Sequence, residues 1–359
     1  MAKGVVFFTG FPGFIGRRLV AKLLDTGDQR VVALVEPRFA EQAQALAAEL
    51  DRDRIEVLPG DIGDRRLGLD DDTYDRLTRK VTSVHHLAAI YDLAVPLETA
   101  QRVNVDGTGN VLDLCARCER FERLNYVSTA YVAGDRNGVV YEHELIFGQG
   151  FKNHYESTKF QAEVWVREAM RRIPTTIYRP AIVVGDSRTG ETQKFDGPYY
   201  MLRTIARAMH DRTPIVQFGR AEAPFNCVPV DFIVDAIAAV SRDPDAVGET
   251  LHLVDPEPVT AAQMGELFSL EYAGKKPSMR VPPSVIENAL RSKRVRDAFG
   301  GAPHEAIRYL NHPVRFDTRR AEAVLARHGL RCPLLEEYIA PIVSFFKAHE
   351  TDPALVPLR

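Results

Sequence analysis

The stretch VVFFTGFPGFIG, residues 5–16, decides the fold. An apolar, strand-like run enters a glycine-rich turn, and a helical pattern over residues 14–24 follows directly. Glycines at this spacing allow a tight turn, a close approach of the backbone to a pyrophosphate, and close packing of a helix on a strand. The helix N-terminus adds free N–H groups and positive potential. We therefore predict a dinucleotide-binding loop, with contacts from Gly10, Pro12, Gly13, Phe14, Ile15 and Gly16.

Apolar runs and helical patterns alternate through the first 185 residues. Strands separated by helices of this length favour a parallel sheet with helices on both faces, which is the doubly wound α/β class. Such a sheet binds its ligand at the carboxyl ends of its strands. The predicted strands are residues 5–9, 31–35, 55–58, 83–88, 124–128 and 176–184, and the predicted helices are residues 14–24, 39–50, 99–117 and 155–171.

The regular alternation ends near residue 185, where a polar, glycine-containing loop follows. Residues 1–185 are predicted to form a Rossmann-type dinucleotide-binding domain, and residues 225–255 are predicted to return to it. Residues 186–224 and 256–359 are predicted to form a smaller, mainly helical substrate-binding or lid region.

The composition excludes several other classes of protein. The chain has 359 residues, four cysteines and a formal net charge of −3. Four cysteines are too few for a disulfide framework, which indicates a reducing compartment. The charge gives no general attraction to nucleic acid, and the apolar start is too short for a signal peptide or a membrane span. We predict a cytoplasmic globular protein with no nucleic-acid partner and no integral membrane segment.

The four cysteines also do not have the spacing of a metal site. Cys115 and Cys118 form a CxxC pair, but no second pair of ligands has a matching spacing. We predict two half-buried thiols and no metal.

The end of the second predicted strand carries conflicting signals for cofactor choice. Glu36 would accept hydrogen bonds from the adenine ribose and repel a 2′-phosphate, which favours NAD. Arg38, or Arg17 just past the glycine loop, would pair with a 2′-phosphate. Asp61, after the third predicted strand, is placed to bind the adenine amino group, although an exposed turn aspartate is nearly as good an interpretation.

A tyrosine and a lysine one helical turn apart are the first candidate catalytic pair. Tyr155 and Lys159 share a helix face. We expect the ammonium to lower the pKa of the phenol from about 10 toward working pH, which would make the phenol a proton donor or acceptor for a carbonyl. A second pair, Tyr272 and Lys276, spans Gly274 and follows no suitable strand, so we assign it no function.

Two hydroxyls end the fifth predicted strand, 26 residues before the tyrosine. Ser128 or Thr129 can hydrogen-bond a substrate carbonyl oxygen and polarise it. The alternative for Thr129 is a threonine that caps the following turn.

These motifs resemble the extended short-chain dehydrogenase/reductases. Within them the chain is most similar to the fatty acyl-CoA reductase and thioester reductase branch. The matching segments are GFPGFIG (10–16), VSTAYV (127–132), YRPAIVVGD (178–186) and VPVDFIVDAI (228–237).

The resemblance implies a triad of Thr129, Tyr155 and Lys159, with Ser128 as a near neighbour of the triad hydroxyl. It implies NADP as cofactor, with NAD left open because Glu36 stands where that branch usually has an arginine. Further cofactor contacts are implied at Ile62, Ala88, Pro180 and Ile182.

The leading functional hypothesis is NAD(P)H-dependent reduction of an acyl thioester, CoA-linked or carrier-bound, to an aldehyde, and a second reduction to the alcohol stays open. The alternatives are an alcohol dehydrogenase or ketoreductase, a nucleotide-sugar epimerase or dehydratase, and a non-enzymatic cofactor-sensing or scaffold protein. Related enzymes often pair through two helices on one side of the sheet, so the resemblance also allows a homodimer.

Overall fold

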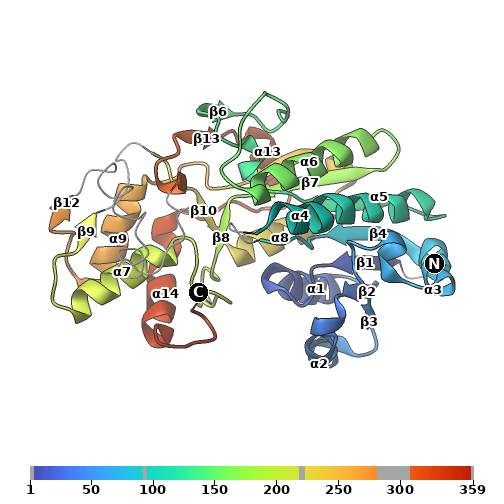
Figure 1. Ribbon diagram of the computed structural model, residues 1–359, viewed down its shortest axis with the longest axis horizontal. Helices are drawn as coiled ribbons and strands as arrows, with labels where there is room; N and C mark the ends of the chain where they lie inside the picture. Colours follow the sequence, from blue (N-terminus) through green and yellow to red (C-terminus); the bar gives the residue numbers. More distant parts are fainter. Residues whose placement is uncertain (1–3, 92–94, 218–222, 281–307, 357–359) are drawn as a thin grey trace.

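The computed structural model describes residues 4–91, 95–217, 223–280 and 308–356. Seven parallel strands form the main sheet in the order β11-β7-β5-β4-β1-β2-β3 (Figure 1). This confirms the doubly wound α/β class. The strands are β1 (Val5–Thr9), β2 (Arg30–Val35), β3 (Ile55–Pro59), β4 (Val81–His86), β5 (Arg123–Val127), β7 (Thr175–Pro180) and β11 (Thr250–Leu253).

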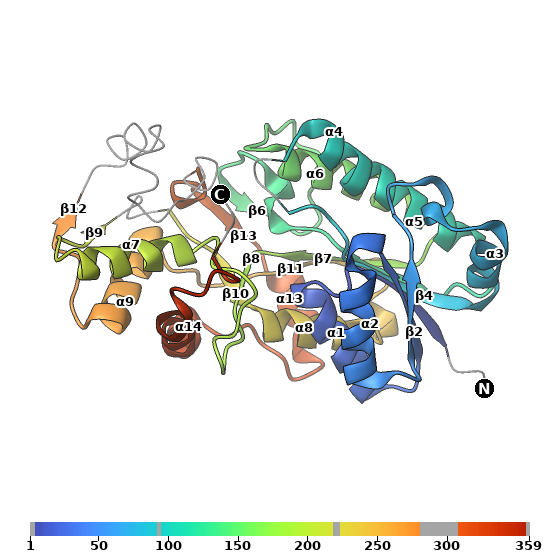
Figure 2. The ribbon, with the colours of Figure 1, turned by 60° about the horizontal axis from the view of Figure 1, so that its bottom comes forward.

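Helices cover both faces of the sheet, each over its own apolar core (Figure 2). One core lies under α1 (Phe14–Thr26), α2 (Ala40–Asp51) and α8 (Val230–Val240). The other lies under α3 (Asp71–Lys80), α5 (Gly107–Arg117) and α6 (His154–Ala169). Short 3-10 turns link these elements at Pro37–Phe39, Arg65–Gly68, Ala130–Ala133 and Pro244–Ala246.

The strand order reverses between β1 and β4, which is where a doubly wound sheet binds its ligand. These two strands pair in parallel, and their last residues, Thr9 and His86, lie side by side in the register. The glycine loop follows β1 directly, so it opens at this switch point.

A second group of helices lies beyond one end of the sheet, on the left in Figure 1. It contains α7 (Tyr199–His210), α9 (Ala261–Ala273) and α14 (Leu335–His349), and aromatic rings such as Phe195 and Phe346 pack within it, with centroids 4.9 Å apart. Helix α13 (Arg319–Ala326) packs near β11. Short parallel pairs lie outside the main sheet: β9 (Val216–Gln217) with β12 (Met279–Arg280), β10 (Cys227–Pro229) with β8 (Ile182–Val184), and β13 (Val314–Phe316) with β6 (Gly138–Val140).

The predicted strand over residues 176–184 is wrong as a single element. It is two strands, β7 and β8, and only β7 belongs to the main sheet. Pro180 has no N–H to donate, which interrupts the ladder. The Ala181 amide still donates to the Leu253 carbonyl of β11, whereas the Ile182 amide donates to the Asn226 carbonyl, outside the main sheet.

The predicted helix over residues 99–117 is continuous but not regular. A short α4 (Leu97–Ala100) passes into a π-helical stretch, Gln101–Asp106, before α5 begins. Such wide turns occur often at functional sites. Here the wide turn carries the buried Asn104, whose amide donates to the Thr158 hydroxyl at 3.0 Å and whose oxygen accepts from the Ile90 amide at 2.9 Å.

Across the described ranges, we find no helix whose length and apolar character would let it cross a bilayer.

Candidate active site

The glycine loop has the geometry that a pyrophosphate needs. Gly10 has a φ of +96°, and a Cβ there would lie 3.0 Å from the Ala88 nitrogen. A Cβ on Gly16 would lie 2.3 Å from the Gly10 carbonyl oxygen. Gly13 precedes α1 and has no side chain to cap its first turn, so the free N–H groups of that turn remain available. The residues therefore fit a dinucleotide phosphate at this helix end.

The residues expected at the adenosine end all have protein partners. Arg38 pairs with Glu36 at 2.7 Å, and Arg17 pairs with Glu191 at 2.6 Å. Asp61 accepts from Arg102 at 2.7 Å and from the Gly63 amide at 2.8 Å. The carboxyl of Glu36 and the guanidinium of Arg38 therefore lie together at the end of β2.

The other predicted cofactor residues lie near the carboxyl ends of the strands. The Ala88 amide donates to the Thr9 hydroxyl at 3.2 Å beside the glycine loop. Pro180 and Ile182 flank the break between β7 and β8. Ile62 packs against the backbone of Gly107.

The start of α6 places the tyrosine and the lysine. The Asn153 side chain accepts from the Glu156 amide at 2.9 Å, which caps the helix and sets Tyr155 in its first turn. Lys159 follows one turn later on the same face. The positions of Tyr155 and Lys159 therefore both depend on the Asn153 cap, which fixes where α6 begins.

Tyr155 lies against an aromatic neighbour and a hydroxyl. Its ring meets Tyr91 edge-on, with centroids 5.2 Å apart. Burial raises the pKa of Tyr155 above its ordinary value, and a hydrogen bond with the Thr129 side chain opposes that rise. The Thr129 hydroxyl also lies 3.5 Å from the Pro180 carbonyl oxygen, which is the limit of hydrogen bonding.

Lys159 is buried and turned toward β5. Its ammonium donates to the Tyr126 hydroxyl and to the Val127 carbonyl, both at 2.9 Å. Burial lowers the pKa of Lys159 to about 7, opposed by the charge of Glu163. The expectation that this ammonium lowers the pKa of Tyr155 is wrong for this structure, because burial dominates at Tyr155 and the hydrogen bonds of the ammonium go to β5.

Ser128 and Thr129 are adjacent but face different partners. The Ser128 hydroxyl donates to Glu163 at 2.6 Å. Glu163 is fully buried and also binds Arg179 at 2.6 Å, so Ser128 belongs to a buried ionic cluster. Thr129 is the hydroxyl beside Tyr155.

Three features at the site carried no recognised signal in the sequence. Tyr126 is one of several strand tyrosines, and its contact with Lys159 requires β5 and α6 to be packed together. Tyr91 lies in a loop, and the π-helical turn at Asn104 leaves no mark in the apolar pattern. The second tyrosine–lysine pair lies apart from this site: Tyr272 donates to Glu350 at 2.8 Å.

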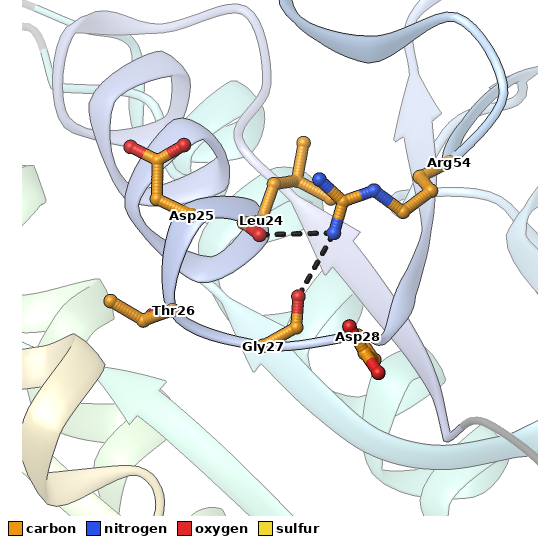
Figure 3. A pocket seen from close by; sticks show the side chains of 6 residues that line it. All are labelled: Leu24, Asp25, Thr26, Gly27, Asp28 and Arg54. Atoms are coloured by element: carbon orange, nitrogen blue, oxygen red, sulfur yellow. Dashed lines mark hydrogen bonds between the residues drawn. The ribbon is translucent and has the colours of Figure 1, made fainter.

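A surface depression near the amino ends of β2 and β3 is bridged by hydrogen bonds between the residues that line it (Figure 3). Arg54 reaches across it and donates to the carbonyls of Leu24 and Gly27, both at 2.9 Å. These hydrogen bonds connect the end of α1 to the start of β3. Because the polar groups of the depression are bonded to one another, we assign it no ligand.

Comparisons with known proteins agree with this geometry. The family model of the male sterility protein, an NAD-binding domain, matches residues 8–237. The solved structure of the terminal R domain from the myxalamid PKS-NRPS biosynthetic pathway superposes with a TM-score of 0.85 at 27% identity, covering 99% of this chain and 93% of that one.

Two curated relatives are much longer proteins. A linear gramicidin synthase of Brevibacillus parabrevis is 26% identical over 367 residues, covering 94% of this chain and 7% of that protein. The L-2-aminoadipate reductase of Penicillium chrysogenum is 29% identical in its large subunit over 287 residues, covering 72% of this chain and 20% of that protein. The chain therefore corresponds to a small part of each.

Proposed function

Because the chain belongs to the NAD-binding male sterility protein family of extended short-chain dehydrogenase/reductases, we propose that it reduces acyl thioesters to aldehydes with a reduced nicotinamide cofactor. The observation that carries this proposal is the position of Tyr155, Thr129 and Lys159 at the carboxyl ends of the strands, where the glycine loop also opens. The relatives, which include a reductase domain and an aminoadipate reductase, support the thioester substrate.

The side chains divide the chemistry between them. The bound nicotinamide would supply a hydride to the thioester carbonyl carbon. Thr129 and Tyr155 would donate hydrogen bonds to the oxygen as it becomes negative. Tyr155 would then give its proton to that oxygen. Breaking the C–S bond of the resulting hemithioacetal releases aldehyde and thiol, and Lys159 compensates the charge left on Tyr155.

We favour NADPH as the cofactor. The Arg38–Glu36 pair is exposed, and exposed ion pairs contribute only about 0–1 kcal/mol. A 2′-phosphate carries more charge than the carboxylate and offers a bidentate partner, so it would displace Glu36 from Arg38. An Arg38→Ala variant is expected to lose NADPH affinity while keeping affinity for NADH.

We favour a carrier-bound acyl group as the thioester. The relatives that include a linear gramicidin synthase and an R domain from a PKS-NRPS pathway support this choice over fatty acyl-CoA and lipid metabolism. A second reduction to the alcohol would use the same three side chains.

We also infer a homodimer formed through α5 and α6. Trp165 on α6 is 42% exposed, and its ring packs over Gly109 of α5. This exposed apolar ring on the surface of α5 and α6 would be buried in the dimer. Sedimentation of wild type and Trp165→Glu would test this: the variant is expected to be a monomer, and equal sedimentation of both would contradict the inference.

The experiment supplies acyl-CoA and an acyl-phosphopantetheinyl carrier to the purified protein, with NADPH and NADH tested separately. Cofactor oxidation, free thiol and aldehyde are measured in parallel. Thiol and aldehyde in equal amounts with the carrier substrate would support the proposal. Turnover of aldehydes or ketones without any thioester turnover would reject it in favour of a carbonyl reductase.

A further inference from the structure

Lys159 is the end of a buried chain of hydrogen bonds that crosses three strands of the sheet. Its ammonium donates to the Tyr126 hydroxyl and lies 4.4 Å from the centre of the Tyr126 ring. The Tyr126 hydroxyl also interacts with the Thr108 side chain of α5. His86 of β4 and Thr9 of β1 continue the chain: Thr108 Oγ1 lies 3.1 Å from His86 Nε2, and His86 Nδ1 lies 2.7 Å from Thr9 Oγ1.

One arrangement of protons satisfies Thr108, His86 and Thr9 together. The Thr108 hydroxyl donates to the Asn104 carbonyl at 2.7 Å, so its oxygen accepts from His86 Nε2–H. Burial and the charge of Lys159 lower the pKa of His86 to about 3, so this histidine is neutral and its Nδ1 accepts from the Thr9 hydroxyl. The Tyr126 hydroxyl accepts from the Lys159 ammonium at 2.9 Å, and the Tyr126 ring lies against the His86 ring, with centroids 5.6 Å apart.

The Tyr126 hydroxyl oxygen is one of the few groups that stabilise the charge of Lys159. The ammonium is buried, and its two hydrogen-bond acceptors are the Tyr126 hydroxyl and the Val127 carbonyl. The ionisable groups near it are Tyr126 on β5, His86 on β4, and Tyr155 and Glu163 on its own helix. Glu163 is already bound to Arg179, Arg167 and Ser128.

We propose that Tyr126 is a positioning residue of the active site, packed against His86, and that its hydroxyl holds the ammonium of Lys159, one helical turn from Tyr155, in place and in its charged form. This inference rests on the proposed function, because it assigns Lys159 to the reaction. It adds Tyr126 of β5 to Thr129, Tyr155 and Lys159, the three side chains already assigned to the reaction.

The test compares Tyr126→Phe with Tyr178→Phe. The first variant keeps the ring over the ammonium and removes the hydroxyl. The second removes an equally buried tyrosine hydroxyl from β7, which donates to Asn125 at 2.9 Å and is not a partner of Lys159. Loss of a hydrogen bond to a charged group is expected to lower the pKa of Lys159 by about one unit in Tyr126→Phe. Tyr178→Phe should leave it unchanged.

Two readouts separate this inference from the proposed function. The first is the pKa of Lys159 from NMR titration of ¹³C-labelled lysine, assigned with Lys159→Met, and it needs no catalytic activity. The second is the pH dependence of kcat: the alkaline limb should move to lower pH in Tyr126→Phe, with the KM for the cofactor unchanged. A shifted pKa in a protein that reduces no thioester would support the chain of contacts and reject the proposed function.

An unshifted pKa in Tyr126→Phe, or an equal shift in Tyr178→Phe, would overturn the inference. If Tyr126→Phe does not fold, Thr108→Val tests the same chain one link away. It removes the hydroxyl that interacts with the Tyr126 side chain and with His86, and it is expected to shift the pKa of Lys159 in the same direction by a smaller amount. An unchanged titration in Thr108→Val would also overturn the inference.

Discussion

Tyr155 is the side chain on which the proposed chemistry depends most. Tyr155→Phe removes the proton donor and keeps the ring against Tyr91. We expect kcat to fall by roughly 100- to 10,000-fold, because general acid catalysis contributes about that much. Affinity for NADPH, measured by fluorescence titration, should be unchanged. Tyr272→Phe is the matched control from the second tyrosine–lysine pair, and it should retain full activity. Equal loss in both variants would refute the assignment.

Lys159 also makes stability depend on pH. Its pKa is about 7 in the folded protein, below its ordinary value of 10.5. Between these values the unfolded chain binds more protons, so this group makes stability rise with pH, by at most about 1.4 kcal/mol per pH unit. Urea unfolding at pH 7.5 and pH 9 should therefore show a smaller increase in Lys159→Met than in wild type. The same increase in both proteins would contradict a lowered pKa for the buried Lys159.

At the scale of the element, the cap of α6 links stability to activity. Asn153→Ala should cost about 0.5–2 kcal/mol of unfolding free energy and lower kcat, because the capped turn holds Tyr155. Asp70→Ala removes a similar cap from α3, far from the site, and should cost stability without affecting kcat. Asn153→Asp keeps the capping oxygen but loses the amide that donates to the Tyr309 hydroxyl at 2.9 Å, so it should restore both quantities in part. Full activity in a destabilised Asn153→Ala protein would show that the cap does not position the tyrosine.

Local patterns predicted the elements whose partners follow soon in the sequence. The strands at residues 5–9, 31–35 and 55–58 are confirmed to within one residue. The first two are apolar runs buried in the sheet, and the third is a half-buried edge strand that keeps an alternating apolar pattern. The split between β7 and β8 was missed because the partner of β8 comes from residues 227–229, far along the chain. The π-helical turn was missed because one wide turn barely disturbs the apolar period.

The candidate site divides in the same way. The glycine loop and the Tyr155–Lys159 spacing are local motifs, and the sequence sufficed to predict them. The hydrogen bond between Lys159 and Tyr126 joins residues 33 positions apart and depends on helix–sheet packing. The different partners of Ser128 and Thr129 likewise depend on where Glu163 lies, so the pattern alone could not rank the two hydroxyls.

At the scale of the whole molecule, a buried carboxyl joins distant segments. Glu142 accepts hydrogen bonds from the backbone amides of His252 in β11 and of Arg320 and Ala321 in α13, at 2.8–3.0 Å. Burial raises the pKa of Glu142 to about 7, opposed by these hydrogen bonds. This raised value means that its contribution to stability is full below about pH 4.5 and is lost as pH rises through about 7.

Replacing Glu142 with glutamine, an uncharged side chain of the same shape, removes the carboxyl that titrates. The free energy of unfolding of wild type should decrease between pH 5 and pH 8, and in Glu142→Gln this decrease should be smaller by about 1–3 kcal/mol, as measured by urea unfolding. Glu336→Gln, at an exposed carboxyl of α14, is the control and should behave as wild type. An identical pH dependence in wild type and Glu142→Gln would rule out this role for Glu142.

The most direct test of the central claim follows the hydride itself. NADPH deuterated at the transferred position of its nicotinamide is incubated with the protein and a carrier-bound acyl thioester, and the products are analysed by mass spectrometry. The account predicts an aldehyde with one deuterium on its carbonyl carbon and one free thiol per NADPH oxidised, both abolished in Tyr155→Phe. Free thiol with a carboxylic acid and no deuterium transfer would mean hydrolysis, and would contradict the claim that this chain is a thioester reductase.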